Sequence, residues 1–192
     1  MALDYSRKSP GVYREEVFLV PESALPTGVP GFVGFADERI QAGVNLNEAI
    51  PIHRKAEFVT QPNEQPGSYL ADAVAGFFDN GGIRCYVVLA DPSQDREAAL
   101  KNAIEALGPL SDLDLVSAPD AMTLQLQNGQ FDSGAALRVQ AAMLTHCARH
   151  GNRLAILDAL PESDTEAVLA QRQAIVVGQT EPVNGALYYP WL

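Results

Sequence analysis

The chain has 192 residues, of which 47% are hydrophobic and 19% charged, and its formal net charge is −11. This length gives one globular domain room for a proper core, and the composition is unlike that of disordered or fibrous chains. The acidic charge opposes binding to nucleic-acid phosphates and to anionic membrane surfaces. No apolar run approaches the roughly 18 residues that span a bilayer, so we expect neither nucleic-acid binding nor membrane insertion.

Residues 1–29 predict an extended N-terminal arm followed by a linker. Residues 12–20 are rich in β-forming side chains, which favours a single strand. Rigid and turn-forming residues then separate this strand from the rest of the chain, as in a stiff linker; they are Pro21, Pro26, Gly28 and Pro30.

From residue 30 onward, short apolar runs alternate with segments of helical periodicity. The predicted strands are residues 31–36, 50–54, 83–89, 114–118, 153–157 and 186–189; the predicted helices begin near Ser68, Ser93, Ala135 and Glu162. Residues 37–49 predict a polar loop. Glycines inside the first strand indicate that another element approaches closely. This alternation predicts an α/β domain over residues 30–192, with a mostly parallel sheet and helices on both faces.

The cysteines and histidines can be interpreted either as structural residues or as part of a zinc site. Cys85 and Cys147 are the only cysteines, and both lie in apolar segments, which favours buried free thiols in a reducing cytoplasm. His146 and His150 are four residues apart beside Cys147, the start of a zinc site. No paired ligand motif completes that site, and imidazolium groups at a helix C-terminus explain both histidines more simply. We therefore expect no metal.

Three aspartates give the most specific hypothesis of an enzyme site. Asp91, Asp120 and Asp158 each follow a predicted strand, and the carboxyl ends of parallel strands meet at one edge of a sheet, where ligands bind. Such a group could hold Mg²⁺ for phosphoryl chemistry. The alternative is that each Asp caps a turn or a helix. Glycine-rich phosphate loops and a serine nucleophile elbow are both missing, so we expect no catalytic residue and no cofactor.

Several stretches, taken in order, resemble the contractile tail sheath family of phages and phage-like injection systems. They are Ser9-Pro10-Gly11-Val12-Tyr13 with Glu15-Glu16-Val17, Thr27-Gly28-Val29-Pro30-Gly31-Phe32-Val33-Gly34-Phe35, Tyr69-Leu70-Ala71 to Phe77-Phe78 with Asn80-Gly81-Gly82, Arg84-Cys85-Tyr86-Val87-Val88, Ala118-Pro119-Asp120, Arg153-Leu154-Ala155-Ile156-Leu157-Asp158 and Ala186-Leu187-Tyr188-Tyr189-Pro190-Trp191. No single stretch is diagnostic, but together they extend from residue 9 to residue 191.

The resemblance implies a structural subunit and not an enzyme. Sheath subunits form hexameric rings stacked helically around an inner tube, and they contract to drive that tube through a target envelope. The implied partners are other sheath subunits, the inner tube protein, and baseplate and terminator proteins. Assembly is expected in the bacterial cytoplasm, within a virion tail or a phage-tail-like particle. The implied inter-subunit arm adds a strand to a neighbour and comprises Val12, Tyr13, Arg14, Glu15, Glu16, Val17, Phe18 and Leu19.

The end of the chain departs from the family pattern. Sheath proteins continue well past the motif at residues 188–191, so the resemblance implies a domain truncated at its C-terminus. The aromatic residues of this motif normally sit against a core or a partner. Two alternatives to the sheath interpretation stay open: a metal- or nucleotide-dependent enzyme on a doubly wound fold, and a small module that binds an unrelated protein by strand addition.

Overall fold

The computed structural model describes residues 28–35, 45–58, 68–91, 93–161, 163–177 and 183–190. The predicted arm at residues 12–20 lies outside the described residues, as do residues 37–44 of the predicted loop. None of the helices in the described ranges is long and apolar enough to cross a membrane.

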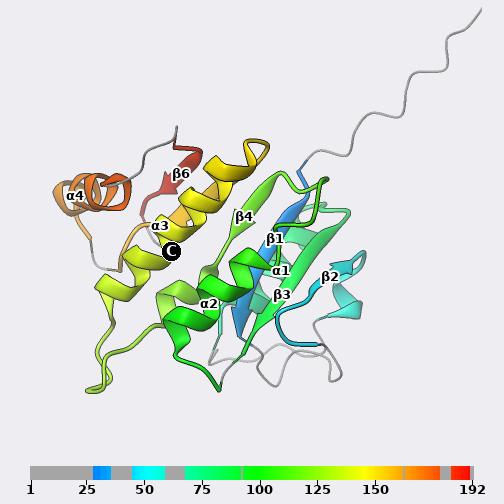
Figure 1. Ribbon diagram of the computed structural model, residues 1–192, viewed down its shortest axis with the longest axis horizontal. Coiled ribbons are helices and arrows are strands. Elements are labelled where there is room, and N and C mark those ends of the chain that lie inside the picture. The colour runs from blue at the N-terminus through cyan, green and yellow to red at the C-terminus, as the bar shows by residue number, and fades with distance from the viewer. Residues whose placement is uncertain are drawn as a thin grey trace, which may run out of the picture.

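The described residues form a central sheet of six strands (Figure 1). Its strands are β1 (Pro30–Phe35), β2 (Ala49–Ile52), β3 (Cys85–Ala90), β4 (Leu115–Ser117), β5 (Leu154–Asp158) and β6 (Gly185–Tyr188), in the lateral order β2-β3-β1-β4-β5-β6. All neighbouring strands are parallel except β2, which runs antiparallel to β3. The predicted mostly parallel sheet is confirmed.

In the described ranges, four α-helices and two short 3₁₀ helices connect the strands. They are α1 (Leu70–Asp79), α2 (Arg96–Glu105), α3 (Ser133–His150) and α4 (Thr165–Val176), with η1 (Lys55–Glu57) and η2 (Pro119–Thr123). Aspartates cap three of them: the side chains of Asp95, Asp132 and Asp164 accept hydrogen bonds from backbone N–H groups in the first turns of α2, α3 and α4.

These caps correct three predicted helix boundaries. The second helix begins after Asp95 and not at Ser93, whose N–H and hydroxyl instead donate to the Asp91 carboxylate in the preceding turn. The third helix begins at Ser133, two residues before the predicted start, because Asp132 accepts a hydrogen bond from the Ala135 N–H. The fourth helix begins at Thr165, three residues after the predicted start, because Asp164 accepts a hydrogen bond from the Ala167 N–H.

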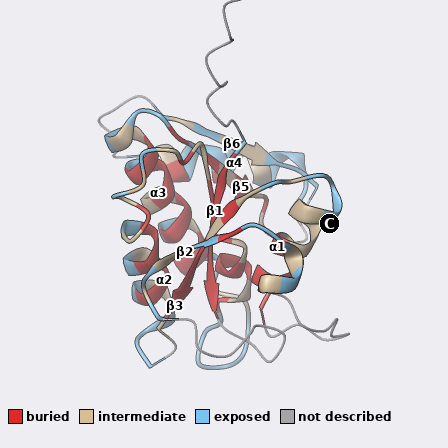
Figure 2. Cartoon of the chain, turned by 90° about the vertical axis from the view of Figure 1, so that its right-hand side faces the viewer, coloured by how far each residue is buried: buried red, intermediate tan, exposed pale blue. Residues whose placement is uncertain are grey.

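The helices cover the two faces of the sheet unequally, and the topology explains why. Right-handed crossovers place a helix on one face when the chain moves in one direction across a sheet and on the other face when it moves back. The steps from β3 to β4, β4 to β5 and β5 to β6 all run in one direction, and α2 and α3 lie together on that face (Figure 2). The step from β1 to β3 runs the other way, and α1 lies on the opposite face.

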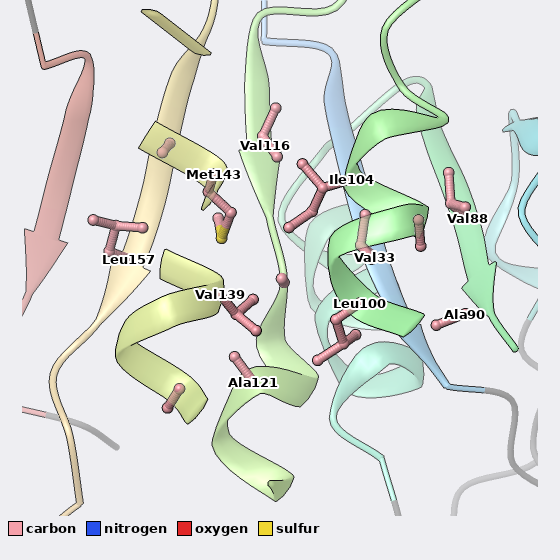
Figure 3. Packing of buried hydrophobic residues seen from close by; sticks show 14 of the residues in the cluster. Val33, Val88, Ala90, Leu100, Ile104, Val116, Ala121, Val139, Met143 and Leu157 are labelled. Carbon is pink, nitrogen blue, oxygen red and sulfur yellow. The ribbon is translucent and has the colours of Figure 1, made fainter. Parts of the chain in front are cut away.

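Two hydrophobic clusters result, one on each face. The larger cluster packs Val33 and Val116 of the sheet against Ile104 of α2 and Met143 of α3 (Figure 3). The smaller cluster, under α1, contains Phe32, Val87, Leu89, Leu70 and Val74. Side-chain alternation along the strands explains the division, since successive residues of β1 point to opposite faces. The predicted buried free thiols are confirmed, because Cys85 and Cys147 are both buried and unpaired.

The glycines of β1 allow close packing, as their positions in the sequence predicted. A Cβ at Gly31 would lie 2.9 Å from the Leu107 side chain. At Gly34 it would lie 2.7 Å from an oxygen of Asp120 and 2.8 Å from the Cβ of Leu70. Because Gly34 of β1 has no side chain, the Asp120 carboxylate and the start of α1 can lie directly against the strand.

Candidate functional site

Asp120 is a buried structural connector at the carboxyl end of the sheet. Its carboxylate accepts hydrogen bonds of 2.6 Å from the backbone N–H of Phe35, at the end of β1, and from that of Tyr69, just before α1. Burial raises the pKa of Asp120, while the hydrogen bonds from Phe35, Ser68 and Tyr69 act in the opposite direction. Both carboxylate oxygens are thus engaged in holding α1 against the sheet.

The other two carboxylates have different environments. Asp91 is solvent-facing and lies in a turn, where hydrogen bonds from the Ser93 side chain and backbone and from Gln94 lower its pKa. Asp158 ends β5, and its backbone carbonyl accepts hydrogen bonds from the side-chain amides of Gln140 and Gln171. Burial raises the pKa of the Asp158 carboxyl.

These three carboxylates cannot share one cation. β3, which precedes Asp91, and β5, which ends at Asp158, are separated by β1 and β4. Neighbouring strands lie about 4.8 Å apart, so the two strands are roughly 14 Å from each other. Magnesium and calcium need oxygen ligands at about 2–2.6 Å. Within the described ranges, no group of three or more His, Cys, Asp or Glu residues is placed to hold a metal ion.

The histidines of α3 are arranged differently from the expected exposed helix end. His146 is fully buried, and its Nε2 lies 2.7 Å from the Nη1 of Arg153. Its Nδ1 has no hydrogen-bond partner among the described residues and lies 3.9 Å from the Oε1 of Glu105. Burial, and secondarily the Arg153 charge, lowers the pKa of His146 to about 4. The interpretation of His146 as an imidazolium stabilised by the helix dipole is therefore wrong, because a neutral imidazole fits this site.

A half-open sheet face is the most distinctive surface among the described residues. On β4, β5 and β6, the residues beneath α2 and α3 include the buried Val116, Ala155 and Leu157. The residues between them point to the opposite face, where α1 covers only the β1 and β3 side. None of this second set is fully buried: Leu115, Ser117, Leu154, Ile156, Asp158, Ala186 and Tyr188. We call these seven residues the open face.

The open face continues into an unpaired sheet edge. The carbonyls of Asn184 and Tyr188 accept hydrogen bonds of 2.9 Å from Ala155 and Ala159 on the β5 side. By the alternation of a parallel ladder, Gly185 and Leu187 then direct their backbone groups away from β5. No described strand pairs with that side of β6. The opposite sheet edge, β2, contains Pro51, which has no N–H to offer a further strand.

The later part of the chain carries most of the exposed large apolar side chains among the described residues, and two of them belong to the open face. The described residues include nine exposed large hydrophobic residues, and six of them lie between residues 154 and 189: Leu154, Leu169, Val177, Val183, Tyr188 and Tyr189. Leu154 is 38% exposed and Tyr188 59% exposed, and both belong to the open face. An apolar face next to an unpaired edge has the chemistry of a protein–protein contact. The aromatic residues at 188 and 189 were the sequence signal for it.

Comparison with known proteins identifies the fold. No protein-family model matches the chain, and no curated relative matches it either. Among solved structures, the chain is similar to one from the helical sheath of the anti-feeding prophage in its contracted state, with 22% identity and a TM-score of 0.50. It is also similar to a chain of the six-fold symmetrised baseplate of the same prophage, with 20% identity and a TM-score of 0.50.

Both matches extend over almost all of this chain but only part of the other. They cover 96% of this chain, and 46% and 47% of the sheath and baseplate chains. The chain therefore spans slightly less than half the length of the structures it resembles. At this level of identity the likeness establishes the architecture: the described domain has a fold like that of a contractile injection system sheath.

Proposed function

We propose that this chain is a structural subunit of a contractile tail sheath, which assembles around an inner tube and contracts to drive that tube through a target envelope. The observation that carries this proposal is the shared fold along 96% of the chain with a protein of a contracted helical sheath. The distribution of the family-like stretches from residue 9 to residue 191 supports the same role.

In this proposal the N-terminal arm links neighbouring subunits. The segment Val12–Leu19 adds a strand to a sheet in an adjacent copy, while the linker that follows absorbs relative movement. About four to six hydrogen bonds at roughly 1 kcal/mol each would contribute several kcal/mol per link. Because such links repeat along a helical assembly, they act together and hold subunits while their mutual orientation changes.

The open face contributes a second contact in the assembled particle. Parallel sheets are normally covered on both faces, and the open face is the part of this sheet that the described helices leave uncovered. The proposed partners are other sheath subunits in stacked hexameric rings, the inner tube protein, and baseplate and terminator proteins. Assembly takes place in the bacterial cytoplasm, and the product is a virion tail or a phage-tail-like particle.

The geometry favours this structural role over an enzyme. Asp120 uses both carboxylate oxygens on backbone N–H groups, and Asp91 holds a local turn. A doubly wound enzyme that used these aspartates would need at least two of them to converge on one ligand. A strand-addition module with an unrelated partner differs from a sheath subunit only in the identity of that partner, so the partner has to be identified directly.

The test begins with high-molecular-weight material pelleted from the source cells, imaged by negative stain and analysed by mass spectrometry. Peptides of this chain in striated tubes are the expected result. Striated tubes that form without the chain, while it stays in the supernatant, would refute the sheath role. A chain lacking residues 1–20 serves as the matched variant: it should keep its fold and fail to enter the tubes.

A further inference from the structure

His146 and Arg153 form a buried polar pair in the domain. Arg153 is 4% exposed and His146 is fully buried. The guanidinium donates to the backbone carbonyls of Leu107, Gly108 and Leu110, which follow α2. It thereby ties the loop between α2 and β4 to the segment that enters β5.

The arrangement determines the protonation state of the histidine. Arg153 can only donate, so the Nε2 of His146 must accept, and the ring proton of the neutral imidazole sits on Nδ1. Within the part of the chain that the structure describes, that proton has no hydrogen-bond partner. A second proton, on Nε2, would place two cations 2.7 Å apart in a buried site, where charges are poorly screened.

The groups around the ring oppose protonation on balance. From α3, His150 lies with its ring centroid 4.5 Å from that of His146, and Arg149 adds a positive charge. From α2, Glu105 favours the protonated form, but its carboxylate is held 2.5 Å from the Nη2 of Arg149. The buried thiol of Cys147 also lies near Arg153.

We infer that His146 and Arg153 form an acid-sensitive joint: when His146 takes up a proton, Arg153 releases the loop between α2 and β4. The two crossovers that this joint connects, β3 to β4 and β4 to β5, both lie on the α2–α3 face of the sheet. The joint therefore links these two crossovers through Arg153, and the inference does not depend on the proposed sheath role.

The sign of the pH dependence follows from linkage. Burial lowers the pKa of His146 to about 4 in the folded chain, and an unfolded histidine titrates near 6.5. The unfolded state therefore binds more protons between these values, and stability falls as the pH falls through this window. The folding equilibrium constant should decrease on the order of 20-fold between pH 7 and pH 5 from this residue alone.

The direct test is a ¹⁵N NMR titration of the histidine rings in the full-length chain, with the exposed His53 as an internal reference. We expect His146 to stay neutral at pH 6, with its proton on Nδ1. A charged ring at pH 6, or a proton on Nε2, would overturn the inference. This measurement uses the unaltered protein, so it does not depend on whether a variant folds.

Substitution then tests the consequence. In His146→Gln, the side-chain carbonyl can accept from Arg153 but cannot be protonated, so the 20-fold acid response should disappear from urea unfolding curves. His150→Gln, a change on the neighbouring ring, should retain most of it. Hydrogen exchange of the Gly108 and Leu110 amides, corrected for intrinsic rates, should accelerate in acid only when His146 is present. An unchanged acid response in His146→Gln would contradict the joint.

Discussion

The β1–β3 pair has a helix against each of its faces, whereas β4, β5 and β6 have helices against only one face among the described residues. The side chains of β1 are buried along its whole length, and those of β3 nearly so. Those of β6 are exposed or intermediate throughout. The two regions belong to one sheet and share its hydrogen-bonding pattern, so the difference lies in what covers them.

This contrast separates residues that stabilise the domain from residues available to partners. A buried side chain on β1 or β3 stabilises the fold through the apolar area it removes from water. An open-face side chain such as Leu154 or Tyr188 leaves part of its area in water, so a partner can still bury it. Stability and assembly should therefore depend on different sets of residues.

The largest expected effect comes from truncating the doubly covered region. Leu70 of α1 is fully buried in the smaller cluster, so Leu70→Ala should lower the free energy of unfolding by about 3 kcal/mol through lost burial and the cavity it leaves. The matched change Leu154→Ala, on the open face, should cost less than about 1 kcal/mol. Urea unfolding measures both. Equal losses would mean that the open face is as well packed as the centre.

Periodicity in the sequence was sufficient to predict the strands, the helices and the two-sided cover. It did not predict the lateral strand order or the antiparallel direction of β2, because these depend on contacts between residues far apart in the chain. The hydrogen bond from the Phe35 N–H to Asp120 illustrates this, since the two residues are 85 positions apart. A capping role for Asp120 could be predicted, but its partners could not.

The α3 histidines show a different limit. His146 follows Val139 and Met143 by seven and three residues, which is the spacing of the buried helix face, so its burial was present in the pattern. Arg153, which follows α3 and occupies the space beside the ring, could not be predicted from helical spacing. The open face could be predicted in part. Its aromatic end was visible in the sequence, but the lack of a described helix over this face follows only from the strand order.

The second prediction concerns the connector between the two regions. In Asp120→Asn, only one side-chain oxygen remains to accept from the backbone N–H groups of Phe35 and Tyr69. The amide N–H₂ group then faces one of these two N–H groups, which loses its acceptor. Leaving a buried donor unpaired should lower the free energy of unfolding by about 2 kcal/mol. Asp91→Asn, in an exposed turn, should change it far less. If the unaltered chain bound magnesium and both Asp120→Asn and Asp91→Asn lost that binding, the result would instead support a cation shared by these aspartates.

A smaller effect is expected for the ion pairs on the α2–α3 surface. Glu97 lies 2.7 Å from the Nη2 of Arg138 and 2.5 Å from the Nζ of Lys101. The hydrogen bond from Arg138 is the main cause that lowers the pKa of Glu97 to about 2. Because both cations are partly exposed, Glu97→Gln should cost only about 1 kcal/mol at pH 7.

The pH dependence of this variant has a definite sign. A carboxyl whose pKa is depressed on folding adds stability above its unfolded pKa and loses it as the pH falls. The difference in unfolding free energy between the unaltered chain and Glu97→Gln should therefore shrink from pH 4.5 toward pH 2. Glu166→Gln, the same change on exposed α4, provides the control. A difference that stays constant over this range would show that the ion pairs contribute nothing.

The smallest effect on stability should accompany a clear effect on association. Tyr188 is 59% exposed on the open face, so Tyr188→Ala should change the free energy of unfolding by less than about 1 kcal/mol. If the open face is a contact surface, the same change should reduce incorporation into high-molecular-weight assemblies, measured by sedimentation. Ile83→Ala, at a residue 83% exposed just before β3, should leave incorporation unchanged. Equal incorporation of the two variants would show that the open face is not used, and the proposed arm would then have to hold neighbouring subunits by itself.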